Sequence, residues 1–247
     1  MQLTVVGSGD AFGSGGRLQT CFLLETGSRK ILLDCGATSQ IGLNRLQFDA
    51  NSIDTIVISH LHGDHFAGLV WIVLAAQYLL KRIAPLRVIG PPGIAARYEA
   101  AAEIFFPGMT KVTRPFELTF VEIGVDRPYA DDGLAVSAFE VSHPSGAPSH
   151  ALRLTAGGKT LGFSGDTEWV EALVTVAAGA DLFITECCAL DRPVKFHLNW
   201  RTLEKHLPRL TAKKLMLSHM NPDMLAAAPS LRSDRVIVAE DGLRLTL

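Results

Sequence analysis

The segment from His60 to His65 constrains this chain more than any other feature, because four potential metal ligands fall within it. It reads His60-Leu-His62-Gly-Asp64-His65 and follows an apolar run, Thr55-Ile-Val-Ile, typical of a strand. On an extended loop, alternate side chains point to the same side, so His60 and His62 are placed to hold one ion. The glycine turn directs Asp64 and His65 towards a second ion. Imidazole and carboxylate ligands suit zinc, iron and manganese. The sequence therefore predicts a metal site at a strand end.

Short β-branched runs alternate with helical patterns along the chain, which is typical of an α/β fold. Strands are predicted near residues 2–6, 20–26, 29–34, 54–59, 86–90, 117–123, 133–141, 150–156, 159–164, 181–185, 214–218, 234–239 and 242–247. Helices are predicted near 66–82, 92–105, 167–178, 199–209 and 222–228, with Asp166 or Thr167 capping the third and Asn199 the fourth. No stretch resembles a linker, so we expect a single domain over residues 1–247.

Composition excludes several classes of partner. The formal net charge of −2 gives no reason to expect nucleic acid or an anionic membrane. Cys21, Cys35, Cys187 and Cys188 lack CxxC spacing and are interpreted as buried thiols in a reducing compartment. The apolar run Phe66–Leu80 is shorter than the roughly 18–20 residues that cross a bilayer, and indicates a buried helix. Since the chain also opens directly in a strand pattern, we expect a cytoplasmic protein.

Two stretches of the chain share one pattern. Cys21–Asp34 and Ala151–Asp166 each read as strand, glycine turn, basic residue, apolar strand and aspartate. A helix and then an apolar strand that begins with Asp follow each stretch, at Asp54 and Asp181. The repeat predicts two similar halves packed face to face.

The segment at His60–His65 resembles the signature of the metallo-β-lactamase superfamily, and further motifs follow in family order. Val141-Ser-His143, Phe163-Ser-Gly-Asp166-Thr and Leu217-Ser-His219 resemble the later motifs that complete the metal sites. The resemblance implies an αββα four-layer sandwich with two divalent ions, zinc first and manganese or iron as alternatives. It assigns His60, His62 and His143 to one metal, Asp64, His65 and His219 to the other, and Asp166 to both.

Asp34, at the end of Leu32-Leu33-Asp34, resembles a family aspartate that supports the site. As an acceptor for a ligand imidazole it would fix the tautomer of that ring. The alternative interpretation is a plain turn residue.

Two segments resemble the ribonuclease Z-like phosphodiesterases within the superfamily. Gly7–Arg17 resembles the opening loop of that branch; it lacks the Gly-Lys-Ser/Thr ending and leads into a strand, so it does not predict a phosphate-binding loop. Phe183-Ile-Thr-Glu186 followed by His197 resembles the branch's glutamate and histidine motif, in which the histidine protonates the leaving oxygen. A departing alkoxide needs such a proton donor. The alternative for His197 is a surface residue before a helix.

A local excess of basic residues accompanies this motif. Seven Lys and Arg lie between Asp191 and Lys214, against Asp191 and Glu204. The excess agrees with an anionic substrate, although a solvated helix face explains it slightly better.

The chain departs from ribonucleases Z that process transfer RNA, which usually carry a long protruding arm. Here little more than one hairpin separates His143 from Asp166. We therefore expect a dinuclear-metal hydrolase that cleaves a small phosphodiester with a metal-bound hydroxide oriented by Asp64, not a protein that docks folded RNA. The apolar Phe66–Leu80 run and the resemblance to dimeric relatives predict a homodimer. The alternatives are a thioester or lactone hydrolase of the same fold, a transfer RNA 3′ endonuclease, and a non-catalytic metal-binding protein.

Overall fold

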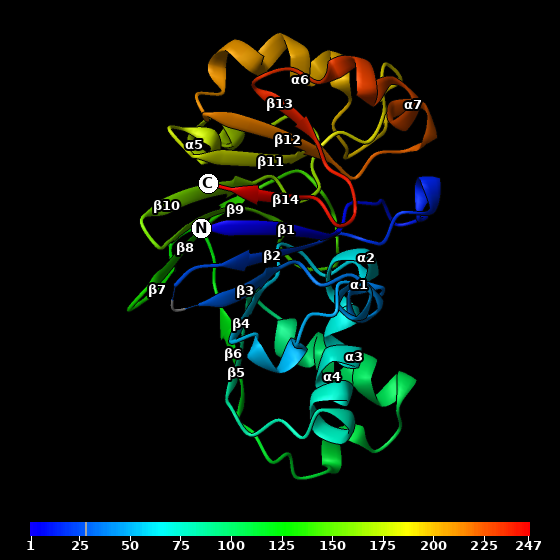
Figure 1. Ribbon diagram of the computed structural model, residues 1–247, viewed down its shortest axis with the longest axis vertical. Coiled ribbons are helices and arrows are strands. Elements are labelled where there is room, and N and C mark those ends of the chain that lie inside the picture. Colours follow the sequence, from blue (N-terminus) through cyan, green and yellow to red (C-terminus); the bar gives the residue numbers. More distant parts are fainter. Residues whose placement is uncertain (28) are drawn as a thin grey trace.

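A computed structural model describes residues 1–27 and 29–247, and its centre is a pair of sheets packed face to face (Figure 1). The first sheet has the order β14 (Arg244–Thr246), β1 (Gln2–Gly7), β2 (Cys21–Glu25), β3 (Lys30–Leu33), β4 (Thr55–Val57), β5 (Leu86–Gly90) and β6 (Leu118–Glu122). The second has the order β13 (Val236–Val238), β12 (Lys214–Ser218), β11 (Leu182–Glu186), β10 (Lys159–Phe163), β9 (His150–Ala156), β8 (Leu134–Glu140) and β7 (Tyr129–Asp131).

Helices cover the outer face of each sheet. The first sheet is covered by α1 (Ser39–Arg45), α2 (Gly63–Phe66), α3 (Gly68–Leu74), a π-helical turn (Ala75–Leu79) and α4 (Ile94–Phe105). The second is covered by α5 (Ala172–Ala177), α6 (Trp200–His206) and α7 (Pro222–Leu231). Short 3-10 turns occupy Ser14–Gly16, Ala50–Ser52, Met109–Lys111 and Leu207–Arg209.

The central strands are apolar on both faces because both faces are covered. On β2, Phe22 and Leu24 point between the sheets, whereas Leu23 points to the helices outside the first sheet. Phe22 meets Phe163 of the second sheet edge to face, with ring centroids 5.9 Å apart. Strands buried on both sides read as continuous apolar runs, which is the pattern seen in the sequence. The expected αββα sandwich is confirmed.

The predicted repeat is visible in the topology. In the first sheet the antiparallel pair β2 and β3 leads through α1 to β4, which pairs parallel with β3. In the second sheet the antiparallel pair β9 and β10 leads through α5 to β11, which pairs parallel with β10. The first half of the chain fills the lower part of Figure 1 and the second half the upper part.

The elements differ from prediction at a few places. Strand β7 and helix α1 are not among the predicted elements, and α5 begins only at Ala172. Asp166 and Thr167 therefore do not cap α5, whereas Asn199 does cap α6 by accepting a 2.8 Å hydrogen bond from Thr202 N. The four cysteines are free and buried. Among the described residues, no helix has both the length and the apolar character needed to cross a membrane.

Candidate metal centre

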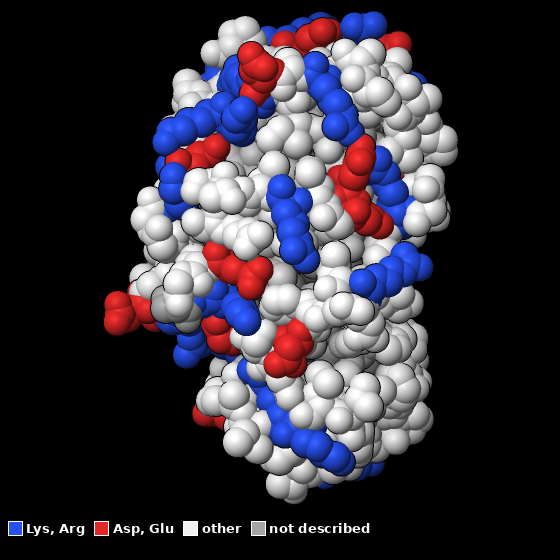
Figure 2. Space-filling model, viewed as in Figure 1, with Lys and Arg blue, Asp and Glu red and all other residues white. Residues whose placement is uncertain are grey.

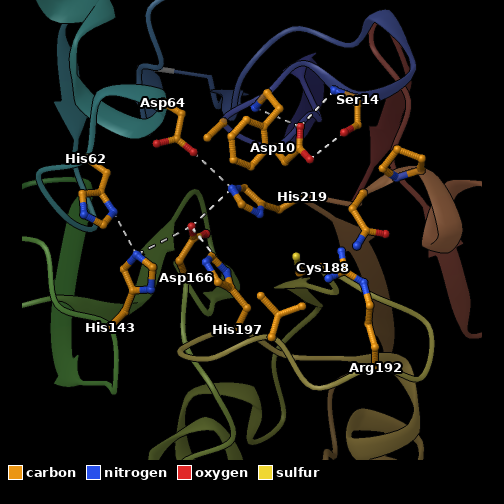
Figure 3. A pocket seen from close by; sticks show the side chains of 15 residues that line it. Asp10, Ser14, His62, Asp64, His143, Asp166, Cys188, Arg192, His197 and His219 are labelled. Carbon is orange, nitrogen blue, oxygen red and sulfur yellow. Dashed lines mark hydrogen bonds and ion pairs between the residues drawn. The ribbon is translucent and has the colours of Figure 1, made fainter.

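The predicted ligands lie where strands of both sheets end, at one edge of the sandwich. His60 and His62 follow β4, His143 follows β8, Asp166 follows β10 and His219 follows β12. Figure 3 shows His62, His143, Asp64, Asp166 and His219 pointing towards one another from these separate segments. The fold thus brings together residues more than 150 positions apart in the sequence.

One group of possible ligand atoms comes from His60, His62 and His143, all within 4.8 Å of one another. Nε2 of His143 lies 2.9 Å from Nδ1 of His62. Nε2 of His60 is buried and has no hydrogen-bond partner among the described residues. Three imidazoles converging in this way match the first predicted ligand set.

A second group comes from Asp64, His65, Asp166 and His219, with the same mutual limit of 4.8 Å. Oδ2 of Asp166 lies 3.3 Å from Nε2 of His65 and 3.2 Å from Nε2 of His219. The same oxygen lies 4.0 Å from Nε2 of both His60 and His143. Asp166 therefore stands between the two groups, as a shared ligand would.

The residues fit divalent metal ions. Nε2 of His65 and Oδ1 of Asp166 are buried and make no hydrogen bond within the described part of the chain, and buried polar atoms of this kind call for a ligand. Burial lowers the pKa of His60 and His62, which keeps these imidazoles in the neutral form that binds metal. At His219 burial opposes protonation, but the carboxylates of Asp166 and Asp64 raise its pKa to about 9. The cluster thus attracts positive charge.

Asp34 holds His65 from behind. Its Oδ2 lies 2.6 Å from Nδ1 of His65 and accepts from Ser59 Oγ, while its Oδ1 accepts from Ser59 N. This is the arrangement that the predicted supporting role requires: Nδ1 of His65 donates, and Nε2 is left to face the metal group. Gly68 lets the start of α3 lie against the loop that follows Asp34, because a Cβ there would lie 2.1 Å from the carbonyl oxygen of Gly36.

Glu186 and His197 lie together beside the metal groups. Nδ1 of His197 is 3.1 Å from Oε2 of Glu186 and 3.9 Å from Oδ2 of Asp166. Glu186 is buried at the end of β11 and also accepts from the backbone N–H of Thr167. The carboxylate can hold the imidazole in one orientation, with Nδ1 towards Glu186.

A cavity of about 570 Å³ opens in front of the metal groups. His62, Asp64, His143, Asp166, His197 and His219 line one part of it. The rest is formed by the glycine-rich loop, by the loop at 188–194 and by the start of α7. The site is therefore a pocket in the edge of the sandwich and not a flat surface.

Most of the basic excess near His197 lies away from this cavity. Arg201, Arg209 and Lys213 form ion pairs with Asp191, Glu171 and Asp181 respectively. Arg192 is the single Lys or Arg among the described residues that line the cavity. Charges of both signs are interspersed on the face in Figure 2, in agreement with a solvated surface.

Sequence reasoning missed parts of the site that act through backbone or through position alone. The carbonyl oxygen of Phe196 lies 3.0 Å from Nδ1 of His143. It can accept a hydrogen bond from a proton on Nδ1, and Nε2 of that ring is then free of a proton. Asn221 lines the cavity without belonging to any motif, whereas Phe12 lines it from within the Gly7–Arg17 loop. Phe196 adopts a left-handed backbone with φ of 66°, and no residue type there signals it. The role of Asn221 can be recognised only once the fold is known.

Comparison with solved structures places the chain in the metallo-β-lactamase fold. The human short-form tRNase Z (ELAC1) superposes with a TM-score of 0.81 at 23% identity, over 100% of this chain and 99% of that chain. A diphosphatase of the PhnP family superposes with a TM-score of 0.77 at 18% identity, over 100% and 97%. Ribonuclease Z from Saccharolobus solfataricus is 25% identical over 90% of this chain and 89% of its own length.

The sequence matches the family described as Anti-Pycsar protein Apyc1 over residues 1–240, and the chain belongs to that family. Together with the ribonuclease Z relatives, this makes the chain a metal-dependent hydrolase of the ribonuclease Z-like branch of the superfamily.

Proposed function

We propose that this chain is a dinuclear-metal phosphodiesterase that cleaves a small phosphodiester, such as a cyclic nucleotide. The observation that carries the proposal is the joint placement of two metal-ligand groups and the Glu186–His197 pair on one cavity. Metal ions held by such ligands could hydrolyse many kinds of bond. A positioned imidazole beside them suits a substrate whose leaving group needs a proton.

The chain's own residues divide the chemistry between them. His60, His62 and His143 would hold one divalent ion, Asp64, His65 and His219 the other, and Asp166 both. Such ions, zinc first, lower the pKa of water to about 7 and neutralise charge on the phosphate oxygens. Asp64, which lines the cavity, would orient the attacking water or take its proton. His197, held by Glu186, would deliver a proton to the departing oxygen.

The size of the cavity favours a small substrate. Its volume of about 570 Å³ lies within the range of about 300–1,000 Å³ common for small-molecule sites. Between His143 and Asp166, the described chain forms the β9–β10 hairpin within the second sheet. Ribonucleases Z that process transfer RNA usually carry a protruding arm, and we expected none in this segment. A net charge of −2 also gives little long-range attraction for a large polyanion.

A substrate panel tests the proposal. Metal-loaded protein should cleave bis(p-nitrophenyl) phosphate and small natural phosphodiesters, and should trim precursor transfer RNA poorly. Release of p-nitrophenolate and gel analysis of the RNA measure the two reactions. Cleavage of thioesters or lactones with phosphodiesters untouched would overturn the proposal in favour of carbonyl chemistry. Efficient transfer RNA maturation would overturn the small-substrate part alone.

We also propose a homodimer. The run Phe66–Leu80 is largely covered by the fold, but Leu79 within it is more than 70% exposed. Ile83 after the run and Ile104 on α4 are also more than 70% exposed, and Phe105 on α4 is half-exposed. The lower right of the face in Figure 2, over α3 and α4, carries few charged side chains. An apolar surface of this kind is typical of a subunit contact. Light scattering at micromolar concentration should give twice the chain mass; a stable monomer contradicts the proposal.

A further inference from the structure

One part of the cavity lies away from the first metal group and offers hydrogen-bond donors that the protein leaves unused. It is formed by Arg192 on the loop before His197 and by Asn221 and Pro222 at the start of α7. In Figure 3, Arg192 lies on the opposite side of the cavity from His62 and His143. The proposed mechanism does not use these residues.

Asn221 has a buried donor without a partner. Its Oδ1 accepts a 3.1 Å hydrogen bond from Met224 N and caps α7, which fixes the orientation of the amide. Nδ2 must therefore be the other atom, and it finds no partner among the described residues although Asn221 is only 5% exposed. An unpaired buried donor costs free energy, so its presence beside a cavity indicates a ligand.

Arg192 brings a positive charge to the same part of the cavity. Its Nε lies 3.8 Å from Oδ1 of Asp223, too far for a hydrogen bond, and both side chains are 46% exposed or more. Such a loose surface pair leaves the guanidinium free to turn to another acceptor at little cost. The guanidinium presents several donors in a fixed fork, which suits carboxylate, phosphate and carbonyl oxygens.

The neighbouring acidic group does not use these donors. Asp10 also lines the cavity, but its carboxylate accepts from Phe12 N, Ser14 N and Ser14 Oγ and shapes the glycine-rich loop. The start of α7, a helix of ten residues, borders this part of the cavity at Pro222, and Asp223 in its first turn is the loose partner of Arg192. Asp10 is thus occupied within its own loop, and Nδ2 of Asn221 and the guanidinium of Arg192 remain able to donate to a ligand.

We propose that Arg192 and Asn221 form a subsite that binds an oxygen acceptor on the part of the substrate remote from the scissile phosphate. The inference rests on the proposed phosphodiesterase function and adds a substrate class: diesters whose esterifying alcohol carries a carbonyl or anionic oxygen. A simple alkyl ester would leave the subsite unfilled.

Three p-nitrophenyl diesters with the same leaving group test the subsite. The methyl ester has no remote acceptor, the thymidine 5′-ester has carbonyl acceptors, and the 3-carboxypropyl ester has a carboxylate. Arg192→Gln removes the charge, and Asn221→Ser removes Nδ2 while serine still caps α7. Arg232→Gln, which breaks a surface pair with Glu240, is the matched control.

In both site variants, KM for an acceptor-bearing ester should rise about tenfold more than KM for the methyl ester, the loss of roughly one hydrogen bond. A rise in KM for the thymidine ester indicates recognition of a carbonyl oxygen, and a rise for the carboxypropyl ester indicates recognition of an anionic oxygen. Arg232→Gln should leave all three unchanged. Equal effects on all three esters, or none, would overturn the subsite while leaving the phosphodiesterase function standing.

Calorimetry supplies a readout that does not need turnover. Metal-loaded protein should bind thymidine 5′-monophosphate or 3-carboxypropyl phosphate, the two acceptor-bearing probes, more tightly than methyl phosphate, and each variant should reduce that preference about tenfold. If the preference falls as expected but no diester is cleaved, the subsite stands and the proposed function fails. If the wild-type protein shows no preference for either acceptor-bearing probe, the subsite is wrong. A melting curve for Asn221→Ser checks that the cap of α7 still stabilises the fold. Arg192→Gln tests the subsite without changing that cap.

Discussion

Asp34 and Asp166 follow corresponding strands in the two halves of the molecule but differ in their distance from the strand and in their surroundings. Each follows the second strand of an antiparallel pair, β3 or β10, whose next parallel neighbour is β4 or β11. Both oxygens of Asp34 are engaged by Ser59 and His65. Asp166 has one oxygen without a partner among the described residues and the other facing imidazoles of both groups. The loop after the corresponding strand thus supports a ligand in one half and supplies one in the other.

The strands that follow these aspartates differ in the same way. β4 leads into the ligand-dense segment His60–His65, whereas β11 ends at Glu186, which holds His197. The first half therefore concentrates metal ligands in one short loop, and the second half contributes single residues from several strand ends. This division predicts that substitutions in the second half separate metal binding from proton donation more cleanly.

The largest effect is expected for Asp166→Ala. Because Asp166 stands between both ligand groups, its loss should release both ions and lower activity by at least about 10³-fold. Wild-type protein purified without chelator should approach two equivalents of zinc by elemental analysis. His219→Ala should chiefly loosen one ion. A wild-type stoichiometry that stays at one under saturating zinc would contradict the two-metal proposal.

The next largest effect is expected for His197→Ala, which separates the chemical step from metal binding. The variant should keep its metal content, since His197 is not in either ligand set. It should lose about 10²–10⁴-fold in kcat/KM on a diester with an alcohol leaving group, because the proton donor is gone. The loss should shrink with nitrophenolate, which leaves without a proton. Equal losses on both substrates would show that His197 is not the general acid.

The ligand-bearing segment could be predicted because it is local. His60–His65 carries its pattern within one loop, and the later motifs each follow an apolar strand, so resemblance alone placed seven residues that the fold then brings together. The strands were also predictable, since both faces of the central ones are buried and read as apolar runs.

What sequence could not predict depends on tertiary position. Helix α1 has a polar, glycine-containing sequence, Ser39-Gln-Ile-Gly-Leu-Asn-Arg45, and is stabilised by packing on β1 and α3. Asp166 and Thr167 look like helix caps in sequence. In the structure, Asp166 lines the cavity and Thr167 N donates a hydrogen bond to Glu186. The donors of Arg192 and Asn221 meet only because loops from different elements border one cavity.

A smaller effect is expected for Asp34→Asn, which tests the supporting half of the comparison. The amide still accepts from Ser59 N through its oxygen, but its NH2 group then faces Nδ1 of His65. His65 would have to carry its proton on Nε2, the atom that faces the metal group. Zinc affinity should fall about 10–100-fold, as for other partners of ligand histidines. Competition with a chelating dye measures it; an unchanged affinity would make Asp34 a plain turn residue.

The smallest effect concerns Phe196, whose carbonyl joins His143 to the loop that carries His197. The turn is closed by a 3.0 Å hydrogen bond from His197 N to Val194 O, and Phe196 sits in it with φ of 66°. Glycine adopts this backbone freely, whereas a β-branched residue resists it by about 1–2 kcal/mol or more. Phe196→Gly and Phe196→Val both remove the ring, so their difference reports the backbone. Val should lower kcat several-fold relative to Gly, because the carbonyl moves from His143 and His197 moves with it. Equal kcat values for the two variants would mean that the ring, and not the turn, positions this part of the site.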